Sequence, residues 1–309
     1  MSLDYTQLAK LPRLLAQVSL RPLQGQRFQS TGFADLGPAR YALPDGTEML
    51  LVESAQSVAN RMEAACWDAG KNDLISELKG LPHIVVKAGE RFVTASVLEA
   101  HRINSEYIMK TADGADTDFK KQFSKEIGYA ADAPVDWRKF HDGLLKYDPG
   151  CLVHGCFLEE IGGRLRVMRA LSSFIEATDV SVAESGGVKN NLVQPELKGG
   201  EGNVPFPRTE FVAKEITAYF NLDVALIRGF GFTEAPTRLL MALSLLKIRR
   251  FLSTGLRLRT ACDFKIAGEL KVESGFPIPE ENFLLTECTR LLAASKDSFA
   301  NPAITIVER

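Results

Sequence analysis

The chain has 309 residues, 45% of them hydrophobic and 25% charged, which is the composition of a globular protein rather than a disordered one. Its formal net charge of −2 excludes nucleic-acid binding by bulk positive charge, so any such site must be a local basic patch. The longest apolar runs are too short to span a bilayer, and the polar opening MSLDYTQLAK does not resemble a secretory leader. We therefore expect a cytoplasmic protein that does not contact membranes.

The first third of the chain is predicted to form strands and two helices. Residues 13–25 mix apolar and polar side chains at near-alternate spacing, which predicts an opening strand. Residues 53–67 place apolar side chains at helical intervals and predict a helix with one buried face. Extended pairs are expected at residues 30–53 and 81–97, and a second helix at residues 99–110.

The remaining two thirds alternate between helical and extended patterns. Residues 111–149 are polar and interrupted by glycine and proline, which predicts a helical insertion. Beyond it we predict a hairpin at residues 151–170, a helix at 209–220, a strand at 221–232, a helix at 236–252 and two closing strands at 259–273. Because strands and helices alternate and several neighbours are linked as hairpins, the sheet should be mainly antiparallel.

The segment of residues 178–208 has neither helical nor strand periodicity over most of its length and contains two Gly-Gly pairs and three prolines. Structureless connections of this length are uncommon inside compact domains and are usually binding loops or linkers. Ordered, amphipathic sequences flank the segment, so we interpret it as an extended finger or thumb loop held by a rigid body. Its run SGGVKNN predicts a glycine turn whose backbone N–H groups could form an anion-binding nest.

These patterns favour a single α+β domain over residues 1–309, with an RNA-recognition-like or ferredoxin-like core and large finger and thumb insertions. A doubly wound dinucleotide fold is the weaker alternative, because no G-x-G-x-x-G run joins a strand to a helix.

The chain offers little for catalysis or for a metal site. Its five cysteines are odd in number and scattered, which is typical of reduced thiols packed as small hydrophobes. His154 lies between Cys151 and Cys156, but the chain lacks a close Cys-x-x-Cys pair for structural zinc. His141 beside Asp142 could act as a general base, yet no partner is evident nearby. We predict no catalytic residue, no metal and no cofactor, and hence a protein that is not an enzyme.

The sequence supports phosphate binding better than catalysis or metal binding. The groups concerned would contact the sugar-phosphate backbone and would not distinguish one base from another. The predicted helix near residue 54 has a polar face with short hydroxyls and one arginine, and the run RLRVMR carries three arginines. The run RGFGF matches the first half of the RNA-recognition consensus and then departs from it, so Phe230 and Phe232 could stack on bases or pack in the core. The predicted contacts are Arg21, Ser54, Ser57, Asn60, Arg61, Arg164, Arg166, Arg169, Gly186, Gly187, Lys189, Asn190 and Arg228.

Two further basic groups, one from Lys247 to Arg259 and one comprising Arg13, Arg21 and Arg27, are each typical of a solvated surface when taken alone. Three such groups in a mildly acidic chain nevertheless favour a local basic surface.

Several separated runs carry a family resemblance: STGFADLGPARY, LLVESAQSVANRMEAACWD, RALSSFIEATDV, SGGVKNN and RGFGF. With these runs the chain resembles the RAMP-superfamily backbone subunit of CRISPR type I-G Cascade, formerly type I-U. The resemblance implies a subunit that binds the spacer backbone of CRISPR RNA and polymerises along it as a helical filament. It also implies contacts with other Cascade subunits, and with target DNA through guide pairing, in antiviral defence.

Two alternatives remain open. The first is a RAMP-type ribonuclease that cuts guide or target RNA, with a metal at an aspartate such as Asp35 or Asp179. The second is a protein scaffold that binds no nucleic acid.

Overall fold

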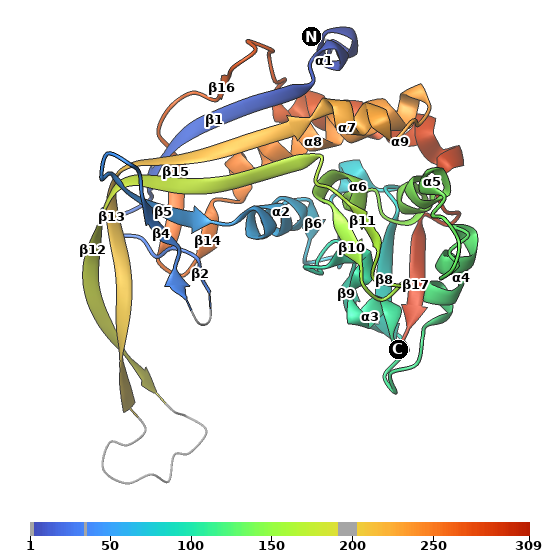
Figure 1. Cartoon of the computed structure of the whole chain (residues 1–309), viewed down its shortest axis with the longest axis horizontal. Helices are drawn as coiled ribbons and strands as arrows, with labels where there is room; N and C mark the ends of the chain where they lie inside the picture. Colours follow the sequence, from blue (N-terminus) through green and yellow to red (C-terminus); the bar gives the residue numbers. More distant parts are fainter. Residues whose placement is uncertain (1–2, 34–35, 191–202) are drawn as a thin grey trace.

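A computed structural model describes residues 3–33, 36–190 and 203–309 of the chain. Figure 1 shows an elongated sheet, helices stacked against one of its faces, a hairpin projecting from one end and a smaller mixed lobe at the other. Within the described part of the chain, no helix is long and apolar enough to cross a membrane.

The main sheet has eight strands, all paired antiparallel. In spatial order they are β14 (Arg257–Arg259), β15 (Cys262–Ile266), β1 (Arg13–Pro22), β13 (Asn203–Asp223), β12 (Leu171–Asn190), β5 (Glu48–Glu53) and β4 (Arg40–Ala42), and β16 (Lys271–Val272) pairs with β1 outside this path.

Four of these strands define the core topology. In chain order they are β1, β12, β13 and β15, and in space they lie in the order β15, β1, β13, β12. Helix α2 (Ala55–Ala64) comes between the first and second of them, and α8 (Glu234–Thr254) between the third and fourth. This is the β-α-β-β-α-β arrangement of the ferredoxin-like fold, so the predicted fold class is confirmed.

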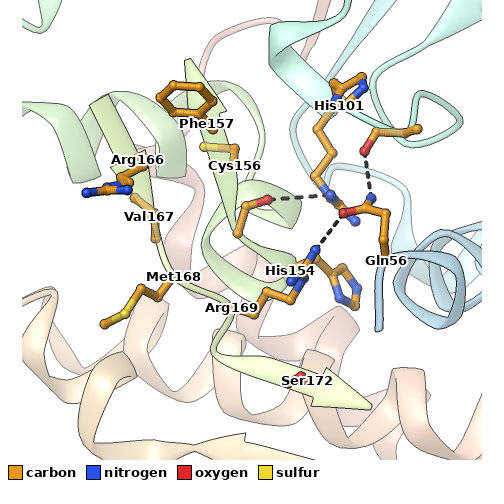
Figure 2. A pocket seen from close by; sticks show the side chains of 13 residues that line it. Gln56, His101, His154, Cys156, Phe157, Arg166, Val167, Met168, Arg169 and Ser172 are labelled. Carbon is orange, nitrogen blue, oxygen red and sulfur yellow. Dashed lines mark hydrogen bonds between the residues drawn. The ribbon is translucent and has the colours of Figure 1, made fainter. Parts of the chain in front are cut away.

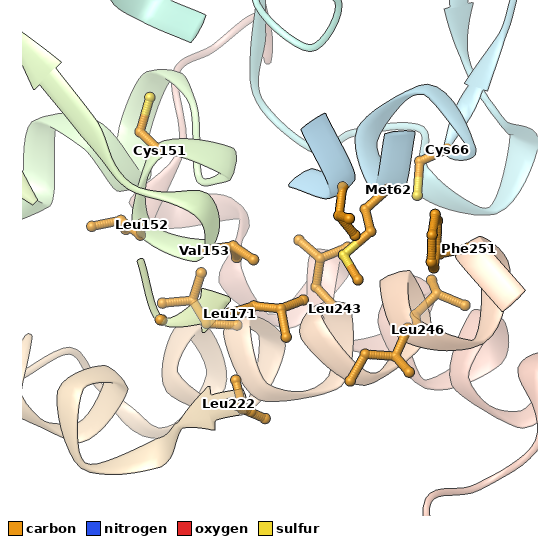
Figure 3. Close-up of a cluster of buried hydrophobic side chains, with 14 of the residues drawn as sticks. Met62, Cys66, Cys151, Leu152, Val153, Leu171, Leu222, Leu243, Leu246 and Phe251 are labelled. Atoms are coloured by element: carbon orange, nitrogen blue, oxygen red, sulfur yellow. The ribbon is translucent and has the colours of Figure 1, made fainter. Parts of the chain in front are cut away.

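One face of the sheet is covered by helices and the other is open. Along β1 the buried residues are Leu14, Ala16, Val18 and Leu20, and the residues between them are half-buried or exposed. Helix α8 is apolar almost all round because it lies between the sheet and α9 (Glu281–Ser295). Figure 3 shows Met62, Leu171, Leu222, Leu243, Leu246 and Phe251 converging in this core.

Two predicted elements in the second half are wrong. Residues 209–220, predicted as a helix, belong to strand β13, where Ile216, Ala218, Phe220 and Leu222 are buried at every second position. Residues 221–232, predicted as a strand, contain helix α7 (Val224–Gly229). Asp223 starts this helix, because its side chain accepts a hydrogen bond of 2.8 Å from the Leu226 backbone N–H.

The segment 178–208 also differs from its prediction, because strands β12 and β13 continue through it as a long hairpin. Their pairing runs from Val180 opposite Ala213 to Asn190 opposite Asn203. A ribbon of two strands leaves both outer edges unpaired, so it can accommodate the prolines and glycines that suggested a loop. Residues 191–202 lie outside the described part of the chain.

The smaller lobe is built from residues 67–170 and the end of the chain. Strand β17 (Ile304–Glu308) pairs parallel with β8 (His83–Ala88), which pairs antiparallel with β9 (Arg91–Ala95). Residues 111–149 contain α4 (Asp118–Glu126) and α5 (Trp137–Tyr147). The predicted hairpin at 151–170 exists as β10 (Cys156–Leu158) and β11 (Leu165–Val167), but it is preceded by a short helix, α6 (Gly150–His154), where a strand was expected.

The remaining elements are short. They are α1 (Tyr5–Lys10), β2 (Gly32–Phe33), β3 (Gly37–Pro38), β6 (Trp67–Asp68), β7 (Asp73–Leu74), α3 (Glu106–Met109) and the 3-10 turns η1 (Ser76–Leu78), η2 (Arg102–Asn104) and η3 (Lys296–Ser298).

Candidate nucleic-acid interface

An open cavity of about 480 Å³ lies where the smaller lobe meets the start of α2 and of β12 (Figure 2). We call it the basic groove. Among the described residues its lining includes three arginines, Arg102, Arg166 and Arg169, and no carboxylate. The other lining residues are Gln56, Ala100, His101, His154, Gly155, Cys156, Phe157, Val167, Met168 and Ser172. A concave surface with this charge suits an anionic ligand.

Arg169 is held at the edge of the groove by Gln56. Its Nη2 donates a hydrogen bond of 2.6 Å to Gln56 Oε1. The Gln56 amide is itself fixed, because its Nε2 donates to the Ala100 carbonyl at 2.8 Å and to Asn60 Oδ1 at 3.0 Å. Partial burial, and to a smaller extent the nearby Arg102, lower the pKa of Arg169.

A buried charge cluster forms the floor of the groove. Arg102 Nη2 lies 3.0 Å from Glu63 Oε2, and its Nη1 donates to the Gly155 carbonyl at 3.4 Å. Lys247 Nζ lies 3.5 Å from Glu63 Oε1 and donates to His154 Nε2 at 3.0 Å. Burial and then Lys247 lower the pKa of His154 well below its usual range, so this imidazole is neutral and can accept that bond.

Asp148 lies in the same cluster and is fully buried. Burial and the nearby Glu63 raise the pKa of Asp148 to about 6. Two carboxylates, Glu63 and Asp148, therefore lie beside the two cations Arg102 and Lys247 in a compact cluster of mixed charge beneath the groove.

Gly155 permits the close packing behind the groove. Its φ is +78°, in the left-handed region. A Cβ at this position would lie 2.9 Å from the Val167 carbonyl oxygen and 3.1 Å from the Arg169 backbone nitrogen. Only glycine lets the end of α6 approach β11 this closely.

Two exposed apolar side chains stand beside these cations. Met168 is 71% exposed and Phe157 is 47% exposed, on either side of Arg166 in the β10–β11 hairpin and its link to β12. Cations that can hold phosphates next to apolar surface that can contact bases are the features of a surface for single-stranded nucleic acid.

The structure brings together only some of the predicted residues. Arg166 and Arg169 line the groove, whereas the polar face of α2 is occupied by internal bonds. Ser54 accepts a bond from the Ser57 backbone at 3.3 Å as the helix cap, and Asn60 accepts from Gln56. Ser57 and Arg61 both donate to Glu53, which is buried and also pairs with Arg259.

The other predicted residues lie away from the groove. Arg164 Nη2 donates to the carbonyls of Ala130 and Ala133 at 2.7 and 2.8 Å, so it ties a loop together. Arg21 is exposed on the open face of β1. Arg228 is exposed on α7 and lines a different cavity of about 400 Å³.

The predicted glycine nest has a different backbone from the one expected. Gly186 and Gly187 belong to the β12 ladder, opposite Pro207 and Phe206. Their extended backbone does not curl around an anion, so the predicted turn is wrong. The side chains of Lys189 and Asn190 lie outside what the structure describes.

Several other sequence interpretations can now be decided. Phe230 is 3% exposed and packs in the core, so the base-stacking alternative is excluded for this ring, while Phe232 is half-buried.

The basic run from Lys247 to Arg259 mainly stabilises the fold, because four of its five cations pair with carboxylates, at Glu63, Glu280, Glu281 and Glu53.

The metal alternatives receive no support from the described residues, which contain no group of three or more His, Cys, Asp or Glu side chains able to hold a metal ion. Asp179 forms an ion pair of 3.4 Å with Lys214, and Asp35 lies outside the described residues. All five cysteines are free thiols, and four of them are buried.

Sequence reasoning did not find Gln56, His101, Arg102, Phe157 or Met168. Only Met168 had a usable signal, because strand alternation in RLRVMR places it on the same side as Arg164 and Arg166. Arg102 reaches the groove through contacts with the distant Glu63 and Gly155, which no local pattern encodes.

The fold and the groove define a ferredoxin-like α+β protein with a groove lined by arginines and a long projecting hairpin. The chain belongs to the CRISPR-associated protein GSU0053 family (Cas_GSU0053), whose family model matches residues 14–182. The CRISPR-associated family predicted from the sequence is therefore confirmed.

Solved structures that resemble the chain do so distantly. One is a chain of a "CRISPR RNA-guided surveillance complex, pre-nicking", with 14% identity, 82% of this chain and 76% of that chain covered, and a TM-score of 0.40. Another is the crystal structure of Thermofilum pendens Csc2, with 12% identity, 96% and 79% covered, and a TM-score of 0.33. No curated protein sequence matches.

Proposed function

We propose that this protein is a non-catalytic subunit that binds the spacer backbone of CRISPR RNA in the basic groove. In this proposal, copies of the chain polymerise along the RNA as a Cascade filament, expected to be type I-G, in the cytoplasm. The guide would then be presented to target DNA, and other Cascade subunits would complete the complex. The observation that carries the proposal is the groove itself, which has the two exposed arginines Arg166 and Arg169, the buried Arg102 beneath them and no carboxylate in its lining, in a CRISPR-associated chain of net charge −2.

The chemistry of the groove supports a binder that tolerates any base sequence. Guanidinium groups hold phosphate oxygens through paired N–H donors, and such contacts set position without reading bases. Gln56 fixes Arg169 before any ligand arrives, which lowers the entropic cost of ordering it.

The test is RNA binding by fluorescence anisotropy with a labelled single-stranded RNA of mixed sequence. The double variant Arg166→Ala/Arg169→Ala should weaken binding strongly and reduce the slope of log affinity against log salt by about 1.4, at about 0.7 per lost phosphate contact. The control is Arg91→Ala/Arg290→Ala, which removes two exposed arginines outside the groove and should bind as the wild type does.

Filament formation is tested in a separate experiment, by measuring particle mass. Mass photometry with RNAs of increasing length should give particles whose mass rises in steps of one subunit with each added length of RNA. Wild-type affinity in the Arg166→Ala/Arg169→Ala variant would refute the assignment of the groove, and an RNA-free homogeneous oligomer would favour the scaffold alternative.

A further inference from the structure

The open face of the core sheet carries a row of side chains that the groove does not include. Strand register places Phe174 of β12 opposite Tyr219 of β13, Tyr219 opposite Gln17 of β1, and Gln17 opposite Lys271 of β16. Phe174, Tyr219 and Gln17 point away from the helices, because their neighbours along each strand are buried, and Lys271 is exposed between the half-buried Leu270 and Val272. We call these four residues the aromatic row.

The two rings of the row form a stacked pair. Their centroids lie 5.1 Å apart with an angle of 29° between the planes, and both side chains are half-buried. The hydroxyl of Tyr219 has no hydrogen-bond partner among the described residues, whereas Tyr41 nearby donates a bond of 2.6 Å to Glu176. A flat aromatic surface with an unused hydroxyl at its edge is therefore directed to the open side of the sheet.

The aromatic row continues the basic groove. Ser172 lines the groove and lies two residues before Phe174 on β12, so both side chains are on the same face of that strand. Figure 2 shows Ser172 at the start of this strand, next to Arg169. A chain of nucleotides that leaves Arg169 along β12 would therefore meet Phe174 next.

The open face carries charges of both signs. On the β1 side Arg21 and Lys271 are exposed, the exposed carboxylate Glu273 follows two residues after Lys271, and Arg13 is paired with Asp223 at 2.9 Å. Bases of a bound strand would contact the Phe174–Tyr219 pair, with the Gln17 amide beside them as donor and acceptor.

We infer that the Phe174–Tyr219 pair stacks on nucleobases of the single-stranded RNA held in the basic groove. Stacking on aromatic side chains tolerates every base, because each base has a π face, and sheet aromatics of other single-strand binders work in this way. The inference rests on the proposed function and adds a second contact to it, directed at bases rather than at phosphates.

The test compares Phe174→Leu/Tyr219→Leu with the conservative control Phe174→Tyr/Tyr219→Phe. Leucine keeps apolar surface on the sheet but cannot stack, whereas the control keeps both rings. The probe is a short single-stranded RNA that carries 2-aminopurine, whose fluorescence falls when it stacks on an aromatic ring. We expect the leucine variant to bind at least tenfold more weakly and to lose the quenching, and the control to keep wild-type affinity and quenching.

The possible failures can be told apart. Wild-type affinity and quenching in the leucine variant, together with weak binding by Arg166→Ala/Arg169→Ala, would refute base stacking on the aromatic row. The same result would still support RNA binding in the basic groove. If the leucine variant binds RNA normally but no longer forms large particles, the face is a contact between protein copies, and the inference is wrong. If the wild type binds no RNA, both the proposed function and the inference fail. Unchanged circular dichroism and melting temperature would show that the leucine variant is folded.

Discussion

Gln56 accepts a hydrogen bond of 2.6 Å from Arg169, and this bond joins the first turn of α2 to the segment that leads into β12. It connects two segments that sequence reasoning had treated as separate phosphate-binding candidates. The bond holds the guanidinium at the edge of the groove while leaving its other N–H groups available.

Changing Gln56 to glutamate should weaken RNA binding more than changing it to alanine. A carboxylate at this position would form an ion pair with Arg169 and introduce the first negative charge into the groove lining. Anisotropy titrations should show a loss of a few-fold for Gln56→Ala and at least tenfold for Gln56→Glu at low salt. Gln24→Glu makes the same charge change at an exposed residue outside the groove and should have no effect. Equal affinities for both Gln56 variants would show that Arg169 does not contact RNA.

Replacing Glu53 with glutamine should destabilise the fold. Glu53 is fully buried and neutralises both Arg61 and Arg259, so the variant leaves two guanidinium groups without a countercharge. Breaking a buried ion pair by removing one partner costs about 3–5 kcal/mol, to be measured by urea unfolding. The exposed pair of Arg40 and Glu48 supplies the control, because Glu48→Gln should cost less than about 1 kcal/mol. Similar losses in the two variants would contradict this view of Glu53.

The stability of the protein should contain a component from Asp148 that falls as pH rises. Burial raises the pKa of this carboxyl from 3.8 to about 6, so between these values the folded state holds a proton that the unfolded state has released. The free energy of unfolding contributed by Asp148 is therefore greatest below pH 4 and declines up to about pH 6. Urea unfolding from pH 4 to 7 should show a shallower decline in Asp148→Asn, which keeps an acceptor for the Gly150 N–H. An identical pH dependence in both proteins would refute this assignment.

Guide or complementary RNA should remain intact when incubated with the protein and magnesium. This expectation follows from the proposed non-catalytic role and from the sequence, in which no catalytic motif was recognised. Denaturing gels of end-labelled RNA over several hours provide the measurement, with a known ribonuclease as the positive control. Cleavage that disappears on adding a chelator would favour the ribonuclease alternative, and Asp179→Asn would then identify whether that aspartate is responsible.

The sequence was informative where one periodicity was unambiguous. The alternation in residues 13–22 predicted β1, and the helical spacing in residues 55–66 predicted α2. Residues 209–220 failed because their apolar positions fit both periods, and only pairing with β1 and β12 selects the strand. The ferredoxin-like core was thus predictable in class, although one of its central strands was not.

The candidate site was predictable only in part, for a related reason. Arg166 and Arg169 stand close together in the chain, and a local cluster of charge is visible in sequence. Arg61 has the same side chain but a different role, because Glu53 comes near it only in the folded protein. The Phe174–Tyr219 pair likewise depends on strand register, which joins residues that are far apart in the chain.

The position of β13 between β1 and β12 has a consequence during synthesis of the protein. β1 pairs with β13, β15 and β16, all of which are translated at least 180 residues later. On the ribosome, the first two core strands therefore have no central strand to join until residue 223 has emerged. Nascent chains would expose unpaired strand edges through most of translation, and such edges are prone to aggregation until their partner strand emerges.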